Sequence, residues 1–362
     1  MRGYTPVVRA KKNDLGAITA LSPSARARIF PLVEAPVLVS GGTLTTQSAD
    51  AAIAASKMLG EVRFLFDPLG IEAPARQLLA FRTLVDAKSN FVPVFGLGRK
   101  AIPEQALAAL VADTNGKFAV RLEAVDIEDP ENTWDDLSRL ITTLDTSASD
   151  ALLLLDFGQI QGKDVDQLKE LILDFLTFQP KQLSACEMVL IGSSALNTVS
   201  SVPVDGELDI VRRELALWSR VSFDLAGSRS IGFGDYGIVD PSFAFAGGPS
   251  GNANAKIRYT RHGRIKYFRG HGLYKPNRFY QYHDLANRVA SSSVYLGTEF
   301  SFGDKRIADC ASRISGPGNL ATWVQVDMNH HIEYTARQIA NLEAQVALLS
   351  KEAEISELIA ND

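Results

Sequence analysis

The sequence predicts an α/β fold: a (β/α)8 TIM-like barrel with a lid insertion after strand 8 and a long C-terminal helix. Eight short apolar runs, each bounded by Gly, Pro or a charged residue, recur at regular spacing, and a helical pattern follows each of the first seven. Such continuous runs are typical of parallel strands buried on both faces. A doubly wound open sheet is the alternative, but no GxGxxG motif opens the first helix.

The predicted strands are residues 4–10, 28–34, 62–67, 91–96, 117–123, 151–158, 187–194 and 231–236. The predicted helices between them are residues 14–21, 51–59, 74–87, 103–113, 133–144, 165–178 and 207–219. Residues 220–225 fit either a short extra strand or the approach to the eighth strand. The eighth barrel helix is expected at His331–Ser350, where apolar residues keep helical spacing.

Residues 240–328 interrupt the alternation of strands and helices before this last helix. Two strands at 256–260 and 264–270 are expected to form a hairpin that turns at His262-Gly263, followed by short helices at 279–292 and 305–314. We therefore divide the chain into barrel strands and seven helices (1–239), a basic lid at the C-terminal face (240–328), and the final helix with its extension (329–362). Barrel enzymes keep their active sites at that face.

The composition is that of a globular protein with a large core, because 46% of its 362 residues are hydrophobic. Its net charge of −5 gives no overall attraction to nucleic acids or membranes. The charge is uneven, however: residues 240–330 contain twelve Lys and Arg against six Asp and Glu, and the remainder contains 25 against 36. The basic segment favours anionic groups such as phosphates, or is simply a solvated surface.

Cysteine usage and the N-terminus indicate a cytoplasmic protein. Cys186 and Cys310 show neither CxxC nor zinc-site spacing, which fits two buried thiols in a reducing compartment. No apolar segment of a signal peptide follows Met1, and no apolar run approaches the roughly 20 residues that span a bilayer. We expect no membrane partner.

Polar residues close seven of the eight predicted strands and should meet at the barrel mouth: Lys11, Glu34, Asp67, Glu123, Asp156, Ser193 and Asp235. Glu34 and Asp156 follow apolar runs, so partial desolvation should raise their pKa and suit them to general acid–base catalysis. Asp235 and His331 complete the candidate catalytic set. Lys11 fits an electrostatic clamp or a counter-ion of Glu34. The alternative is that a strand leaving the core must end in something polar.

The basic lid supplies the candidate substrate-binding residues Arg258, Tyr259, Arg269 and Tyr282. Arginine binds phosphate or carboxylate through two parallel hydrogen bonds, and neighbouring aromatic rings stack on bases. These arginines could instead pair with the acidic rim. The adjacent His330 and His331 would point about 100° apart on a helix, so a shared metal ion is disfavoured. The cofactor stays open, with a divalent metal the less favoured alternative.

Several motifs together resemble the "beta protein" family of phages, prophages and bacteria. They are Tyr4-x-Pro-Val-Val-x-x-Lys11, Phe30-Pro-Leu-Val-Glu34, Gly234-Asp-Tyr-Gly-Ile238, Ile257-Arg-Tyr259, Phe268-Arg-Gly270, Phe300-Ser-x-Gly-Asp304, Trp323 and Asn329-His-His331. Where the family usually has Glu-Ala-Leu after the first strand, this chain has a different stretch at 13–21, next to Lys11. The resemblance implies a barrel-like fold and a setting of mobile elements or phage conflict, but no settled reaction.

Two functions follow as hypotheses. In the first, the protein acts in anti-phage defence, and its barrel mouth binds a phosphate-bearing ligand, such as a nucleotide or a nucleic-acid end, and hydrolyses it as a phosphodiesterase would. In the second, it is not an enzyme and recognises a phage or toxin protein through its lid and C-terminal helix. The same helix could join two copies of the chain. A cluster of these side chains in a concave pocket favours the first hypothesis, and paired rim charges favour the second.

Overall fold

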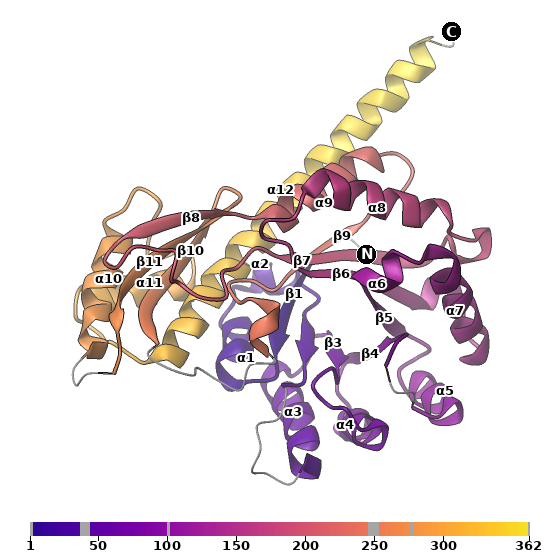
Figure 1. The fold of residues 1–362 in the computed structure, drawn as a ribbon, viewed down its shortest axis with the longest axis horizontal. Coiled ribbons are helices and arrows are strands. Elements are labelled where there is room, and N and C mark those ends of the chain that lie inside the picture. Colours follow the sequence, from indigo (N-terminus) through magenta and orange to yellow (C-terminus); the bar gives the residue numbers. More distant parts are fainter. Residues whose placement is uncertain (1–2, 37–43, 100–101, 245–252, 275–277, 361–362) are drawn as a thin grey trace.

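The computed structural model describes residues 3–36, 44–99, 102–244, 253–274 and 278–360. Eight parallel strands close into a barrel in the order β1-β2-β3-β4-β5-β6-β7-β9, which confirms the predicted fold class (Figure 1). Their bounds are β1 Tyr4–Arg9, β2 Leu32–Glu34, β3 Phe64–Asp67, β4 Phe91–Gly96, β5 Phe118–Glu123, β6 Ala151–Gln159, β7 Glu187–Ser193 and β9 Gly232–Asp235. β1 closes the ring by pairing with β2 on one side and β9 on the other.

Apolar side chains fill the inside of the barrel, so it is a packed core rather than a pore. This cluster contains Val7, Phe30, Leu32, Leu65, Val92, Val94, Ala119, Leu152, Leu154, Val189, Ile191 and Tyr236. Alternate residues of the same strands, such as Leu153, Leu155 and Phe233, belong to the layer between the barrel and its helices. The strands are therefore buried on both faces, which explains why they are continuous apolar runs in the sequence.

The main helices around the barrel are α1 Lys12–Thr19, α3 Leu44–Leu59, α4 Pro74–Asp86, α5 Glu104–Asp113, α7 Pro130–Thr143, α8 Val165–Thr177 and α9 Arg213–Asp224. Two single-turn helices, α2 Pro23–Arg26 and α6 Ala124–Ile127, lie in the connections. The described residues also contain four 3₁₀ turns, η1 Ala148–Asp150, η2 Lys181–Leu183, η3 Pro241–Ala244 and η4 Arg278–Tyr280.

The helix predicted at 207–219 is confirmed from Arg213 onward and is wrong before it, and the extra strand considered at 220–225 is wrong. Residues Glu207–Val211 form strand β8, and residues 220–224 belong to helix α9 rather than to an extra strand. β8 alternates between polar and apolar residues, and only Ile210 of the strand is buried. β8 lies outside the barrel and pairs antiparallel with β11, with Val211 opposite Arg264 and Glu207 opposite Phe268. A short period-two pattern directly before a helix was mistaken for the helix itself.

The predicted hairpin is confirmed as β10 Asn254–Arg261 and β11 Arg264–Gly272, with His262 and Gly263 in the turn. With β8 it forms a three-stranded antiparallel sheet in the order β10-β11-β8. One face packs with α10 Gln281–Ala290 and α11 Phe302–Ala311 around a core that includes Ile257, Phe268 and Trp323. Ile265 and Tyr267 pack instead with Val199 and Val202 of the loop after β7. This sheet thus draws one strand from the segment that we assigned to the barrel.

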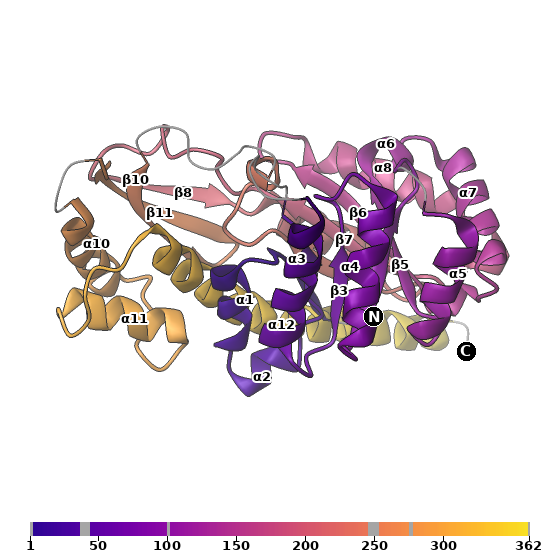
Figure 2. The same ribbon diagram turned by 90° about the horizontal axis from the view of Figure 1, so that it is seen from below.

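Helix α12 spans Leu320–Ala360 and starts well before the predicted residue 331. Asn319 caps it: its Oδ1 accepts a hydrogen bond from the backbone N–H of Thr322 at 3.0 Å. The helix runs along both the barrel and the three-stranded sheet (Figure 2), and its last turns project from the body (Figure 1). Among the described residues, no helix has the length and apolar character needed to span a membrane.

Candidate functional site

A buried arginine, Arg121, is the centre of a charged cluster inside the barrel. Its Nη1 donates to Glu34 Oε1 at 2.8 Å and to Asp67 Oδ2 at 2.7 Å. Its Nε and Nη2 both donate to Asp156 Oδ2, at 2.8 and 2.5 Å. The hydroxyl of Tyr236 accepts from Arg121 and donates to the same Asp156 oxygen at 2.5 Å. We call these five residues the mouth cluster.

The barrel geometry explains why these residues meet. Glu34 and Asp67 are the last residues of β2 and β3 and pair with each other in register. In β5, the inward-facing Ala119 is followed two residues later by Arg121, and in β6 Leu154 is followed by Asp156. Successive residues of a strand face opposite sides, so all four side chains point into the barrel near its carboxyl end. The predicted convergence of Glu34 and Asp156 is therefore seen, although their catalytic role stays a prediction.

A second arginine, Arg99, extends the mouth cluster toward the surface. It follows β4, and its Nη1 and Nη2 bind Asp67 Oδ1 and Oδ2 at 2.5 and 3.1 Å. Its side chain is 19% exposed, whereas that of Arg121 is 3% exposed. Of these two cations, Arg99 is consequently the one that a ligand from solvent could reach.

Burial and the two arginines give the carboxylates different acidities. Burial raises the pKa of Glu34, and Arg121 only partly offsets this effect. Burial would also raise the pKa of Asp67, but Arg99 and Arg121 together hold it below its usual value. Glu34 is thus more readily protonated than Asp67, and a general acid must hold a proton.

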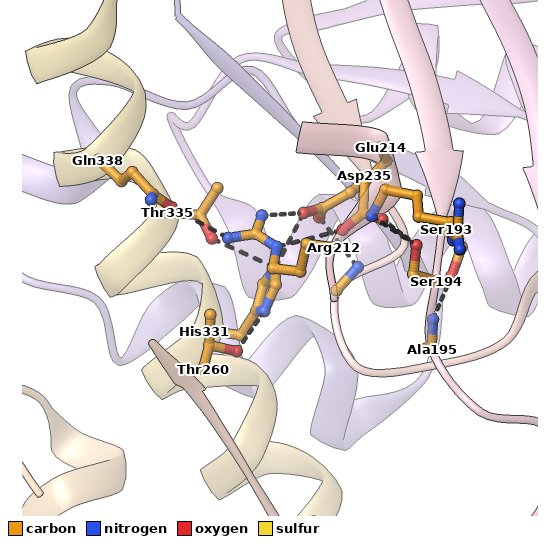
Figure 3. Close-up of polar contacts among 12 residues, drawn as sticks. Ser193, Ser194, Ala195, Arg212, Glu214, Asp235, Thr260, His331, Thr335 and Gln338 are labelled. Atoms are coloured by element: carbon orange, nitrogen blue, oxygen red, sulfur yellow. Dashed lines mark hydrogen bonds and ion pairs between the residues drawn. The ribbon is translucent and has the colours of Figure 1, made fainter. Parts of the chain in front are cut away.

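The predicted position of Asp235 needs correction, because this residue does not join Glu34 and Asp156. Tyr236 faces the barrel interior, so the preceding Asp235 faces the outer layer. There its Oδ1 accepts from the Tyr4 hydroxyl at 2.6 Å, and its Oδ2 accepts from Arg212 Nη2 at 2.7 Å and lies 3.0 Å from His331 Nε2 (Figure 3). The side chain of His331, a residue of α12, therefore meets Asp235 outside the barrel, where α12 faces β9.

We call Asp235, His331, Arg212, Glu214 and Ser194 the outer cluster. All five are buried, and their polar groups bind one another. Arg212 Nε donates to Glu214 at 3.1 Å, and the Ser194 hydroxyl donates to the other oxygen of Glu214 at 2.6 Å. Burial opposes ionisation of Asp235, but His331 and Arg212 hold its pKa well below the usual value. Burial lowers the pKa of His331, and the neighbouring Asp235 opposes this effect. The contact between His331 of α12 and Asp235 of β9 fixes the helix against the barrel, which is a structural role.

The adjacent histidines of α12 face different partners, as their angular separation on a helix requires. His331 Nδ1 lies 2.7 Å from the Thr260 hydroxyl. His330 lies against the sheet: its Nδ1 is 2.8 Å from Asp304 Oδ2, and its ring stacks on Tyr259 at 3.8 Å. The pair thus joins α12 to the barrel on one side and to the three-stranded sheet on the other.

The four lid residues predicted to bind substrate are engaged by protein groups. Arg258 is buried, and its Nε donates to Asp327 at 2.8 Å. Arg269 Nη1 donates to the carbonyls of Val199, Ser200 and Val202 at 2.8, 3.3 and 2.5 Å, and so holds the loop after β7. The buried Tyr259 donates to Asp304 at 2.6 Å, and the buried Tyr282 stacks on Trp323 at 4.7 Å. These side chains do not form a common binding surface.

Lys11 lies where the sequence placed it, at the end of β1, directly before α1. Its side chain is exposed, and Arg9 and Asp14 are its charged neighbours. Arg9 pairs in register with Glu34 across β1 and β2. Lys11 is therefore a second accessible cation near the end of the strand next to Glu34.

Sequence reasoning missed Arg99, Arg121, Arg212 and Glu214. Arg121 could have been found as a charged residue within the apolar strand Phe118–Glu123. Arg212 caps α9 and Glu214 lies in its first turn, in a stretch that we predicted to be one helix from residue 207. Glu123, expected at the rim, instead caps α6 through a reciprocal capping box with Asp126.

Two hollows lie near the carboxyl ends of the strands. One, of about 160 Å³, is lined by Gln77, Val94, Phe95, Gly96, Leu97, Arg99, Ile102, Leu107 and Leu140. The other, of about 380 Å³, is an open hollow at the start of α8, lined by residues 162–166, Arg213 and Arg220. Among the described side chains, no three His, Cys, Asp or Glu are arranged to hold a metal ion.

Comparisons with known proteins show what this chain is similar to. No curated protein matches the chain. A mandelate racemase/muconate lactonizing protein from Herpetosiphon aurantiacus is similar in structure at 13% identity and a TM-score of 0.37, over 75% of this chain and 63% of that one, so less than two thirds of its length is spanned. Triosephosphate isomerase from Bartonella henselae is similar at 12% identity and a TM-score of 0.33, over 65% of this chain and 92% of that one. A family model described as Beta protein matches residues 4–337. The chain therefore belongs to the Beta protein family.

Proposed function

We propose that this protein acts in the cytoplasm in phage–host conflict, as a defence factor whose barrel mouth binds a phosphate-bearing ligand such as a nucleotide or a nucleic-acid end. Membership of the Beta protein family supports the setting, because the resemblance to this family of phages, prophages and bacteria implies mobile elements or phage conflict. The mouth cluster supports the site: four strands bring Arg121 and three carboxylates together at one place, and Arg99, which follows β4, joins them through Asp67.

The observation that carries the proposal is the burial of this charge. Replacing a buried ion pair by apolar residues of similar volume is often neutral or stabilising, so stability alone does not require Arg121 and its three carboxylates. Strongly perturbed charges at the carboxyl end of a barrel are candidates for function. In this proposal, Arg99 and Lys11 bind the anion, because both follow barrel strands at the carboxyl end and can be reached from solvent. If the bound phosphoester is hydrolysed, water attacks the phosphorus, the ester P–O bond breaks, and Glu34 donates a proton to the leaving oxygen.

A thermal-shift titration with inorganic phosphate, nucleotides and divalent cations tests the binding. Lys11→Ala and Arg99→Met should each weaken the stabilisation by phosphate. Lys12→Ala is the control for the first, because Lys12 is also an exposed lysine of the same helix start. Arg82→Met is the control for the second, because Arg82 forms an exposed pair with Asp113. Equal stabilisation of all four variants would contradict the assignment.

The setting is tested by the plating efficiency of phages on cells that express the protein. Wild type should lower plating, and Glu34→Gln should restore it if proton transfer is required. A Glu34→Gln variant that protects as well as wild type would remove hydrolysis from the proposal and leave ligand binding.

Protein recognition is the second candidate, and two observations favour it. Arg258 and Arg269 are already bound by protein groups, and the end of α12 projects from the body (Figure 1). In this case a phage or toxin protein, or a second copy of the chain, docks on the three-stranded sheet and α12. Truncation after residue 347 should then abolish protection, while the phosphate-induced thermal shift remains unchanged.

A further inference from the structure

The smaller hollow beside Arg99 has an apolar lining, which the binding of an anion alone does not require. It lies where β4 ends, between the barrel wall and helices α4, α5 and α7, which contribute Gln77, Leu107 and Leu140. Arg99 lines the hollow and also binds Asp67 of the mouth cluster. One guanidinium group therefore borders both the charged cluster and this hollow.

The lining is almost entirely apolar. Phe95, Leu97, Ile102, Leu107 and Leu140 supply most of the wall. Among the described lining residues, Gln77 is the one side chain besides Arg99 with hydrogen-bonding groups. Its Nε2 already donates to the carbonyl of Ile71 at 2.6 Å. A bound group with several donors and acceptors would lose its hydrogen bonds to water and find few replacements, at a cost of about 1–3 kcal/mol for each unpaired group.

The volume sets the size of the occupant. A cavity of about 150 Å³ lined by apolar side chains holds one benzene ring, and this hollow measures about 160 Å³. A purine with its ribose is larger than this space. The occupant is consequently about one six-membered ring in size.

Gly96 leaves room for the side chain of Arg99 beside the hollow. A Cβ atom at this position would lie 2.6 Å from Arg99 Nε and 3.0 Å from Arg99 Cδ. Any larger residue would push Arg99 from its place between the hollow and Asp67. The strand thus has a glycine at the point where the arginine side chain crosses it.

We infer that this hollow is the side pocket of the mouth site and takes an uncharged apolar ring of the ligand, while Arg99 binds its anionic end. The inference rests on the proposed function and narrows it. The ligand class is an anion, phosphate or another, that carries a hydrocarbon ring, in preference to a nucleotide.

The test compares inorganic phosphate, phenyl phosphate and uridine 5′-phosphate by calorimetric titration of the full chain. Burial of one ring should make phenyl phosphate bind about tenfold or more tightly than inorganic phosphate. Leu107→Trp fills the hollow and should remove this gain but keep phosphate binding. Leu168→Trp is the matched control, because Leu168 is also a half-buried helix leucine packed on the same core, on α8. It should keep the gain.

Each result decides between the two proposals. Equal affinities for phosphate and phenyl phosphate, or an undiminished gain in Leu107→Trp, would overturn the side pocket and leave the anion site standing. Tighter binding of uridine 5′-phosphate than of phenyl phosphate would overturn the choice of an apolar ring. Binding of none of the three would overturn both the proposed function and this inference.

A measurement on wild type makes the test independent of whether Leu107→Trp folds. In methyl spectra of leucine-labelled protein, phenyl phosphate should shift the resonances of Leu107 and Leu140, and leave Leu168 unchanged. Shifts that spare Leu107 and Leu140 while phenyl phosphate binds would overturn the side pocket.

Discussion

Replacing Arg121 with Met tests whether the mouth cluster depends on one cation. The substitution keeps an unbranched, although shorter, side chain and removes its charge. Glu34 and Asp156 then lose their arginine, while Asp67 keeps Arg99. Removing one partner of a buried ion pair costs about 3–5 kcal/mol. We expect a loss of this size in the free energy of unfolding at pH 7.

The loss should depend on pH, because an unpaired buried carboxylate can take up a proton. Burial already raises the pKa of Glu34 in wild type, and the variant lacks the cation that opposes this. A carboxyl group with a raised folded-state pKa costs stability as the pH rises above its unfolded pKa, and the cost is relieved as the pH falls. Protonating an ordinary glutamate costs about 1.36 kcal/mol per pH unit above a pKa of about 4.3. The upper limit for Glu34 is thus about 3.7 kcal/mol at pH 7 and about 1 kcal/mol at pH 5.

Urea unfolding at pH 7 and pH 5 measures this effect through the fluorescence of the buried Trp134, Trp218 and Trp323. Arg139→Met is the control, since Arg139 pairs with Asp136 at the surface with 77% of its side chain exposed, and should change stability by less than about 1 kcal/mol. A loss in Arg121→Met no larger than in the control, or equal at both pH values, would refute the electrostatic account of the cluster.

Three further substitutions test other parts of the structure, each by urea unfolding. Arg258→Met should cost about 3–5 kcal/mol at pH 7 and less at pH 5, because burial already raises the pKa of its partner Asp327 to about 6; a loss that grows toward low pH would be contrary to this. Tyr4→Phe removes the donor to Asp235 and should cost about 1–3 kcal/mol, whereas the exposed Tyr280→Phe should be silent. Gly237→Ala should cost more than Gly60→Ala: both glycines have φ near +60°, but only at Gly237 would the new Cβ meet Met328 Sδ, at 2.5 Å. Equal losses in the two alanine variants would show that the contact with α12 is relaxed without cost.

The fold could be predicted because the barrel strands are buried on both faces and flanked by clear helical patterns. The error at β8 has a physical cause. Glu207–Val211 gains its strand conformation from pairing with β11, which lies more than fifty residues further along the chain, and no local signal reports that partner. The neighbouring helix α9 then made the whole stretch resemble one helix.

The candidate site was predicted in part. Glu34 and Asp156 were found because each ends an apolar run that leads to the mouth. Asp235 was misplaced because the end of a strand does not by itself say which face a residue occupies. Counting alternate residues from Gly234 would have placed Tyr236 inside and Asp235 outside. Arg121 was overlooked because its three carboxylate partners come from three other strands.

The most direct test of the central claim asks which arginine senses an added anion. Side-chain Nε–Hε resonances of arginine-labelled wild-type protein can be followed during a titration with inorganic phosphate. We predict that the resonance of Arg99 shifts in a saturable way, while those of Arg258 and Arg269 stay in place. Shifts at Arg258 or Arg269 with Arg99 unchanged would contradict the account and return the binding site to the lid.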